Sequence, residues 1–266
     1  MQQTTDAKPD ASFLTVRLAA DEADLLAAQR LRYRVFVEEL GGDGPMVDHA
    51  ERLERDEFDA IVDHLLLIDT RRDPAAGDHV VGAYRLLRGE AAERFGRFYC
   101  DDEYDLTPLR VSGRRLVELG RSCVDPAFRG GAGMFMLWNA LADYVLDRGI
   151  EILFGVASFH GTEIAPLAQA LSWLHHHHLA PEELRPTARP AHAQRMDLIA
   201  PEDLDRRAAM TSMPALIKAY LRLGGVVGEG AWIDHAFNTT DVFLLMDTVA
   251  MSARHRQFYH DRRQVA

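Results

Sequence analysis

The chain has 266 residues, 47% of them hydrophobic, and a formal net charge of −11. This composition supplies enough apolar material for a folded core, and the negative charge argues against a nucleic-acid-binding protein. The longest apolar runs are too short to span a bilayer, residues 1–10 lack the apolar region of a signal peptide, and two cysteines give no disulfide framework. We therefore expect a cytoplasmic protein.

Apolar periodicity predicts strands and helices in alternation along the chain. In chain order we expect a strand at 13–18, a helix at 21–40, a hairpin of strands at 61–69 and 80–87, a short helix at 90–95, a strand at 115–124, a helix at 134–148, a strand at 150–157, helices at 164–176 and 216–223, and strands at 226–233 and 241–246. The proline-rich stretch 181–190 is expected to lack regular structure. No linker divides the chain, so we predict one α/β domain over residues 13–250 with a central sheet, and flexible tails at 1–12 and 254–266.

The most informative segment is a strand that leads through a glycine-rich turn into an apolar helix. The strand contains Glu118 and Arg121, and the turn contains Arg129. The glycines of the turn are Gly130, Gly131 and Gly133. Backbone N–H groups at such a turn, beside the positive end of a helix, favour a bound phosphate. The segment predicts group transfer from a phosphate-bearing carrier to a nucleophile that must lose a proton.

Arginine supplies nearly all of the positive charge, since the chain has only two lysines, Lys8 and Lys218. A GC-rich genome explains this bias without any function. The arginines also fall into clusters, and an acidic partner would be attracted to them. These clusters are Arg85 with Arg88, Arg94 with Arg97, and Arg110 with Arg114 and Arg115.

Several short motifs together resemble a known enzyme family. Their order matches the acyl-homoserine-lactone autoinducer synthases in the segments LRYRVF (31–36), DEFD (56–59), RLL (85–87) and Glu118-x-x-Arg121. Further segments resemble a sister group, the ornithine-acyl carrier protein N-acyltransferases. These segments are SFHGT (158–162), LHHHHLAP (174–181), KAYLRLG (218–224) and FNTTDV (237–242). The resemblance covers roughly residues 25–250.

The resemblance implies a GCN5-related N-acyltransferase (GNAT) fold, with a central mixed, mostly antiparallel sheet flanked by helices. It implies that a 3-hydroxyacyl chain passes from acyl carrier protein to the α-amine of L-ornithine, giving lyso-ornithine lipid. The acyl-phosphopantetheine of the carrier is then a substrate, and no resident cofactor or metal is expected. Alternatives are acylation of glutamine or another amino acid, an autoinducer synthase using S-adenosylmethionine, and a non-catalytic acyl-binding module.

One departure from the family bears on the donor. Acetyl-CoA-using GNAT enzymes carry small residues in the pyrophosphate loop, in the pattern Arg/Gln-x-x-Gly-x-Gly/Ala. Counted from Arg129, this chain has Ala132 and Met134 at those positions. A methionine would crowd a pyrophosphate, whereas a carrier-protein arm has one phosphodiester. We therefore expect acyl carrier protein as the donor, with Arg129, Gly130, Gly131 and Gly133 binding its phosphopantetheine.

The resemblance also assigns roles at the reacting centre. Glu118 is the predicted base that removes a proton from the amine, directly or through water. An ion pair with Arg121 or another arginine is its structural alternative, and Arg121 itself is predicted to hold the donor or Glu118. Arg32, Asp56 and Asp59 match positions near the acceptor, and a solvated charge network is the alternative role for these three residues.

Two other patterns have more than one interpretation. The run His175 to His178 resembles a metal-binding tract, but a helix turns consecutive residues to different faces, so we expect no metal. The helix around 213–223 has an apolar stripe that fits either a peripheral contact with the inner membrane or ordinary core packing. The sequence leaves acyl length, head group and oligomeric state open.

Overall fold

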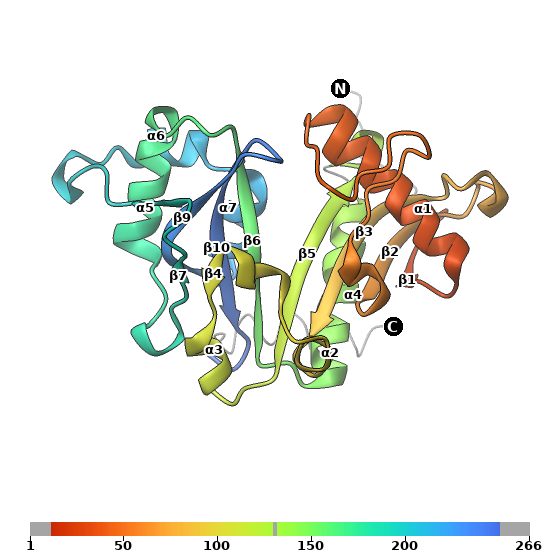
Figure 1. The fold of residues 1–266 in the computed structure, drawn as a ribbon, viewed down its shortest axis with the longest axis horizontal. Helices are drawn as coiled ribbons and strands as arrows, with labels where there is room; N and C mark the ends of the chain where they lie inside the picture. The colour runs from red at the N-terminus through yellow and green to blue at the C-terminus, as the bar shows by residue number, and fades with distance from the viewer. Residues whose placement is uncertain (1–11, 130–131, 251–266) are drawn as a thin grey trace, which may run out of the picture. The chain divides into compact units, whose positions relative to one another are not determined.

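The computed structural model describes residues 12–129 and 132–250, which divide into two compact units (Figure 1). Unit 1 contains residues 1–86 and 121–144, and unit 2 contains the remainder. Strand β5 (Leu116–Val124) and helix α4 (Ala132–Arg148) contribute to both units. A single domain over 13–250 stays a prediction. The predicted tails, apart from Ser12, lie outside the described residues.

Unit 1 is a small sheet with a helix on each face. Its elements are β1 (Leu14–Leu18), α1 (Glu22–Arg32), the π-helix η1 (Tyr33–Glu39), the 3-10 helix η2 (Glu57–Ala60), β2 (Asp63–Asp69), η3 (Pro74–Ala76), β3 (Val80–Arg88), the second half of β5, η5 (Pro126–Phe128) and most of α4. β1, β2 and β3 pair antiparallel, and β5 follows β3 in the sheet order.

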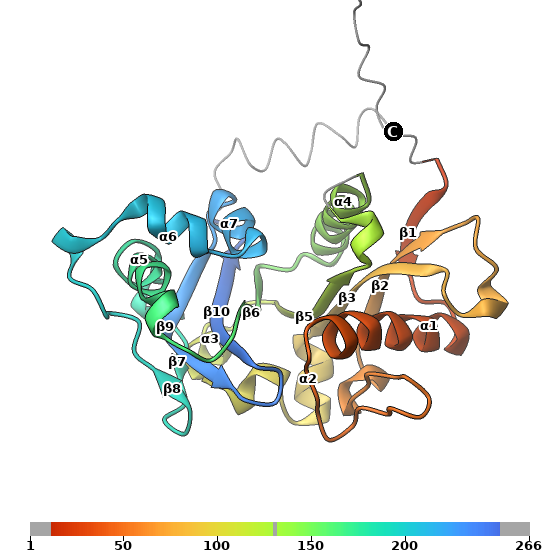
Figure 2. The same ribbon diagram turned by 90° about the horizontal axis from the view of Figure 1, so that it is seen from above.

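The alternation of side chains along β2 explains how two helices cover one sheet. Leu66 and Ile68 join a core with Leu31 of α1, whereas Leu67 points to the other face and contacts the α4 glycine Gly133. Figure 2 shows α1 and α4 on opposite sides of the strands. The α1 N-cap is Asp21, whose carboxylate accepts a hydrogen bond from the Asp24 N–H.

Unit 2 is a mixed sheet with helices packed on its strands. Its further elements are α2 (Gly89–Phe95), η4 (Tyr99–Asp102), β4 (Tyr104–Asp105), α3 (Thr107–Val111), β6 (Ile152–His160), η6 (Ala165–Leu167), α5 (Ala168–His178), η7 (Glu182–Leu184), β7 (Thr187–Ala188), β8 (Ala193–Gln194), η8 (Pro201–Asp203), α6 (Arg206–Ser212), α7 (Ala215–Arg222), β9 (Val226–Asp234) and β10 (Thr239–Asp247). The strand order is β5-β6-β10-β9-β7-β4, and β5–β6 and β7–β9 are the parallel pairs.

Stacked aromatic rings form part of the unit 2 core. Phe154 of β6 and Phe243 of β10 stack with their ring centroids 5.5 Å apart, and Phe98 and Tyr104 each meet one of them at 5.1 Å. The predicted strands and longer helices are confirmed within a few residues. The expectation for 181–190 is wrong, because η7 and β7 form there, with the two-residue β7 held by β4 and β9.

Candidate active site

An irregularity in β5 sets the position of Arg121. This residue has φ of 48°, a left-handed conformation that a non-glycine residue adopts only at an energetic cost. The guanidinium is held from two directions, since Nε donates to Glu54 Oε1 at 2.9 Å and Nη2 donates to Asp56 Oδ2 at 3.3 Å. These contacts stabilise the strained backbone and tie β5 to the segment that precedes β2.

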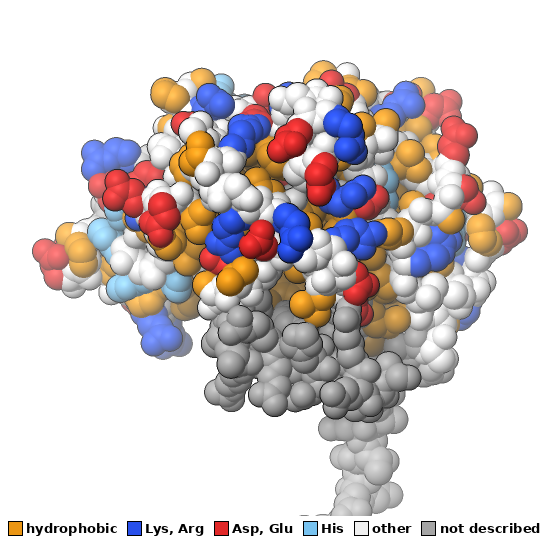
Figure 3. Space-filling view, turned by 90° about the horizontal axis from the view of Figure 1, so that it is seen from below, with side chains coloured by type: hydrophobic (Ala, Val, Ile, Leu, Met, Phe, Trp, Pro, Cys, Tyr) orange, Lys and Arg blue, Asp and Glu red, His pale blue; other side chains and the backbone are white. Residues whose placement is uncertain are grey.

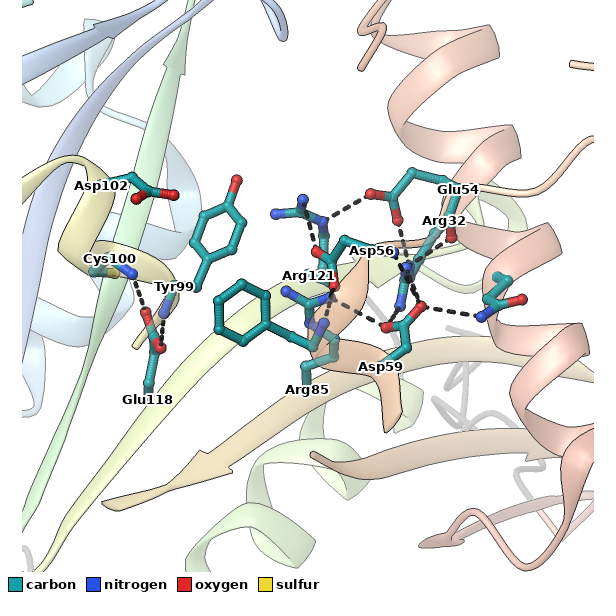
Figure 4. Close-up of polar contacts among 12 residues, drawn as sticks. Arg32, Glu54, Asp56, Asp59, Arg85, Tyr99, Cys100, Asp102, Glu118 and Arg121 are labelled. Atoms are coloured by element: carbon teal, nitrogen blue, oxygen red, sulfur yellow. Dashed lines mark hydrogen bonds and ion pairs between the residues drawn. The ribbon is translucent and has the colours of Figure 1, made fainter. Parts of the chain in front are cut away.

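The same segment meets α1 in a buried charge network of unit 1 (Figure 4). Arg32, whose side chain is 1% exposed, binds Glu54 through Nε and binds both oxygens of Asp59, at 2.6 and 2.9 Å. Arg85 of β3 binds Asp56 Oδ1 at 2.5 Å and Asp59 Oδ1 at 3.1 Å. The structure thus brings together the three predicted acceptor residues and the predicted catalytic Arg121.

Local backbone geometry places the two aspartates. Asp56 is the N-cap of η2, and its Oδ1 accepts the Phe58 N–H at 2.9 Å. Asp59, in the same turn, accepts a hydrogen bond from Gln29 Nε2 at 3.0 Å. The buried His64 ring also contacts this turn, with Nε2 3.0 Å from the Asp59 carbonyl oxygen. A short capped turn therefore aims two carboxylates at three arginines.

Opposite charges decide the ionisation of the network. Burial alone would raise the pKa of Glu54 and of Asp59, but the neighbouring guanidiniums outweigh burial and lower both pKa values. Burial alone would lower the pKa of Arg32, but Glu54 and Asp59 raise it overall. All of these groups are therefore charged at neutral pH.

The charges of this network cancel. Its three guanidiniums are those of Arg32, Arg85 and Arg121, and its three carboxylates are those of Glu54, Asp56 and Asp59. Exposure differs within the set: the Asp56 and Arg121 side chains are each 14% exposed, whereas the other four are at most 6% exposed. A soluble molecule would therefore meet Asp56 and Arg121 first.

Glu118 occupies the first half of β5 in unit 2, where β5 pairs with β6. Its side chain is buried, and its oxygens accept the backbone N–H groups of Tyr99, at 2.8 Å, and Cys100, at 2.7 Å (Figure 4). The carboxylate thereby holds the N-terminus of η4. The role of base stays a prediction.

The predicted phosphate-binding residues are described in part. Gly130 and Gly131 lie outside the described residues. An added Cβ at Gly133 would lie 2.7 Å from a Leu67 methyl group, so close packing of α4 on β2 also accounts for this glycine. Arg129 is half-exposed and binds Glu39 of η1 through two parallel hydrogen bonds of 2.5 and 2.6 Å.

The structure also bears on the histidine run and on the predicted membrane contact. No group of three or more metal-binding side chains occurs among the described residues, the His175–His178 run included. None of the described helices has the length and apolar character to cross a membrane. Met213, which lies just before α7, and Ile217 and Tyr220 of α7 are buried, so most of the apolar stripe packs within unit 2.

Comparisons with known proteins agree with this architecture. Residues 31–139 match the acetyltransferase (GNAT) domain family. The solved structure of BjaI, a CoA-dependent acyl-homoserine lactone synthase, aligns with a TM-score of 0.51 at 18% identity, covering 94% of this chain and 88% of that one. The predicted GNAT fold is confirmed.

Relatives that match over most of their length share a higher sequence identity with this chain than that structure does. A Rhodobacter capsulatus protein named L-ornithine N(alpha)-acyltransferase is 69% identical over 247 residues, covering 93% of this chain and 95% of the relative. The chain belongs to the L-ornithine N(alpha)-acyltransferase family. A member from Brucella abortus is 44% identical, covering 92% of this chain and 88% of its own length. The protein is thus an acyltransferase, as its motifs predict.

Glu54 is the member of the network that sequence reasoning missed. It bridges Arg32 and Arg121, yet nothing in the stretch from Glu51 to Glu57 distinguishes it from the acids around it. The sequence places Arg85 in the RLL motif and in an arginine cluster expected to attract an acidic partner, whereas the structure buries it in the network. A buried arginine partner is the signal that identifies Glu54, and that signal is three-dimensional.

Proposed function

We propose that the protein transfers a 3-hydroxyacyl chain from acyl carrier protein to the α-amine of L-ornithine and so makes lyso-ornithine lipid. The observation that carries the acceptor and the reacting nitrogen is the 69% identity, over 93% of the chain, to a protein named L-ornithine N(alpha)-acyltransferase. The similarity to a CoA-dependent synthase supports the fold alone and does not choose the donor.

The reaction needs a neutral amine and a leaving thiol. The α-nitrogen attacks the thioester carbonyl, an N–C bond forms, and the C–S bond breaks as the tetrahedral intermediate collapses. One amine proton goes to a base, and the phosphopantetheine sulfur leaves as thiolate and takes a proton from water. We assign the base to Glu118, a buried carboxylate on β5, the strand that also carries Arg121.

Acceptor binding falls to the more exposed part of the charge network. Asp59 is the more buried carboxylate, with a side chain 6% exposed, and it accepts bonds from Arg32, Arg85 and Gln29, so we assign it to fixing the network. Asp56 is the more accessible carboxylate and is our assignment for the side-chain ammonium of ornithine. Arg32 and Asp59 hold Asp56 and Arg121 in place. Glutamine has no such cation, so a charge-dependent contact would discriminate against it.

The donor assignment rests on the turn after β5. Ala132 and Met134 stand where the family pattern has small residues, and Met134, in the first turn of α4, is too large to suit a pyrophosphate. A carrier-protein arm brings one phosphate to this turn, with Arg129 as its cation. Because the carrier is a cytoplasmic protein, we also place the enzyme in the cytoplasm. Contact with the inner membrane stays a prediction, and the buried residues of α7 do not support that helix as its surface.

Lipid analysis tests the proposal directly. Cells that express this chain should accumulate a 3-hydroxyacyl-ornithine detectable by mass spectrometry, and purified enzyme should form it from 3-hydroxyacyl carrier protein and ornithine. Glutamine and S-adenosylmethionine, supplied separately with the same donor, are the comparison acceptors. Faster turnover of either comparison acceptor than of ornithine would replace the proposed reaction.

A further inference from the structure

Arg129, the predicted cation for the donor phosphate, is already paired with an acid of its own unit. Glu39, the last residue of η1, takes both terminal nitrogens of the guanidinium, Nη1 on Oε1 at 2.5 Å and Nη2 on Oε2 at 2.6 Å. The remaining nitrogen, Nε, donates to the Val124 carbonyl at 2.9 Å. This two-bond arrangement is the geometry by which arginine binds a carboxylate or a phosphate.

Both partners stand on fixed backbone. On the Arg129 side, the Asp125 N–H donates to the Val81 carbonyl of β3 at 2.9 Å, and the Asp125 carboxylate caps η5 through the Ala127 N–H. A second ion pair joins the same two segments, with Arg34 of η1 3.9 Å from Asp125. Glu39 is therefore held against Arg129 by the fold of unit 1.

Counting donors shows what Arg129 can still bind. A guanidinium has five N–H groups; three are used in the bonds to Glu39 and Val124, which leaves two for a ligand. The remaining N–H of Nη1 and that of Nη2 point to opposite sides of the planar guanidinium, so each can bind only one phosphate oxygen. The hydrogen bonds from Arg129 lower the pKa of Glu39, so this carboxylate is ionised at neutral pH and repels a second anion beside it.

We propose that Glu39 is a donor-specificity residue: its carboxylate occupies one anion position on Arg129, so the site accepts a single phosphodiester and disfavours the several phosphates of CoA. The inference rests on the proposed carrier-protein donor and deepens it. Ala132 and Met134 limit the space for a pyrophosphate, and Glu39 adds a fixed negative charge against it. The two features act on the same discrimination by different physical means.

A matched pair of variants tests this. Glu39→Gln removes the charge with almost no change in shape. Glu38→Gln is the control, because Glu38 is the neighbouring residue and pairs with the exposed Arg52 instead of Arg129. We would measure kcat/KM for one 3-hydroxyacyl group on carrier protein and on CoA. We would also measure the affinity for free CoA by calorimetry, which requires no turnover.

Glu39→Gln should lower the preference for carrier protein over CoA by about two- to fivefold, the range that exposed ion pairs reach. It should tighten free CoA by a similar factor, while Glu38→Gln matches the wild type in both measurements. A wild type that prefers carrier protein, with Glu39→Gln unchanged in preference and CoA affinity, leaves the proposed function standing and overturns the role of Glu39. Equal shifts in both variants also overturn it. A wild type without any donor preference overturns the carrier-protein donor and this inference together.

Discussion

Glu118 combines a predicted chemical role with an observed structural one. Its two hydrogen bonds satisfy backbone donors at the start of η4. A buried donor left unsatisfied costs about 1–3 kcal/mol, so Glu118→Ala should destabilise unit 2 as well as remove a base. The structural contact and the base therefore have to be separated experimentally.

Glu118→Gln makes that separation. Its amide oxygen can accept one of the two backbone N–H groups, so the variant should be more stable than Glu118→Ala, while neither can act as a base. If Glu118 is the base, kcat should fall about 10²–10⁴-fold in both variants, measured at a temperature where circular dichroism shows both folded. Turnover that follows stability alone, with Glu118→Gln near the wild type, would leave Glu118 only its structural role.

Asp56 and Asp59 lie in the same turn, but their substitutions should have different effects. Asp59→Asn leaves Arg32 and Arg85 with excess buried positive charge, and breaking a buried pair in this way costs about 3–5 kcal/mol. Asp56 is more exposed, so Asp56→Asn should cost less stability and mainly raise KM for ornithine. Urea unfolding and steady-state kinetics on both variants check this. A KM effect confined to Asp59→Asn would reverse the assignment.

At the scale of elements, a close approach of β5 to β6 fixes one glycine. The parallel pairing runs from Leu116–Ile152 to Glu118–Phe154, and a Cβ added at Gly155 would lie 2.2 Å from the Leu119 carbonyl oxygen. Gly155→Ala should therefore destabilise the protein by roughly 1–3 kcal/mol, the usual cost of overpacking. The melting temperature and the urea midpoint measure it.

Gly89, the first residue of α2, is the matched control for this substitution. A Cβ there would meet Leu116 at 3.6 Å, an ordinary contact, and alanine favours the helix. Gly89→Ala should leave stability unchanged or slightly higher. If Gly155→Ala is equally neutral, the approach of β5 to β6 is looser than described.

The elements also show what the sequence can and cannot predict. Long patterns such as the strand 115–124 and the helix 134–148 were predicted nearly to the residue, because each buries a continuous face. Short elements such as β4, α3 and α6 were missed, since contacts with distant segments hold them. The motifs identify Arg32, Asp56 and Asp59 as acceptor residues and Arg121 as a catalytic residue, but the network that joins them depends on Glu54 and Arg85, which only the fold brings to them.

At the scale of the molecule, the buried charges make stability depend on pH in two windows. The lowered pKa values of Glu54 and Asp59 give stability that is present above the ordinary carboxyl pKa near 4 and is lost as pH falls below it. Burial lowers the pKa of His64. As pH falls, its imidazole is therefore protonated in the unfolded chain before it is protonated in the folded protein. The stability contributed by neutral His64 is fully present above about pH 6.5 and is lost as pH falls below that value.

Unfolding free energy should therefore decline between pH 7.5 and 5.5, before any carboxylate titrates. His64→Gln keeps a donor for the Asp59 carbonyl and removes the titration, so its decline should be shallower. His160→Gln, at an exposed position of β6, should keep the wild-type slope. Urea unfolding at three pH values gives the comparison. Identical slopes in all three proteins would show that groups other than His64 cause the decline.

Charge on the molecular surface bears on how the carrier docks. Lys and Arg side chains alternate with Asp and Glu on the described part of the face in Figure 3. Arg110 is bound by Asp101, and Arg114 binds Asp247 through two hydrogen bonds of 2.7 and 2.5 Å. These two arginines are thus locally neutralised. Reversing Arg110 would also disturb η4, on which Glu118 depends, so that variant would mix docking with chemistry.

Arg94, in the last turn of α2, is a cleaner probe because it is exposed and has no ion pair among the described residues. If arginines attract the acidic carrier, KM for acyl carrier protein should rise with salt, since exposed charges are screened within about 10 Å at 0.1 M ionic strength. Arg94→Glu should raise that KM at low salt and flatten the salt dependence, with KM for ornithine unchanged. Arg207→Glu, exposed on α6, is the control for charge alone. A KM for acyl carrier protein that is constant from low to high salt in the wild type would show that docking depends on shape and apolar contact instead.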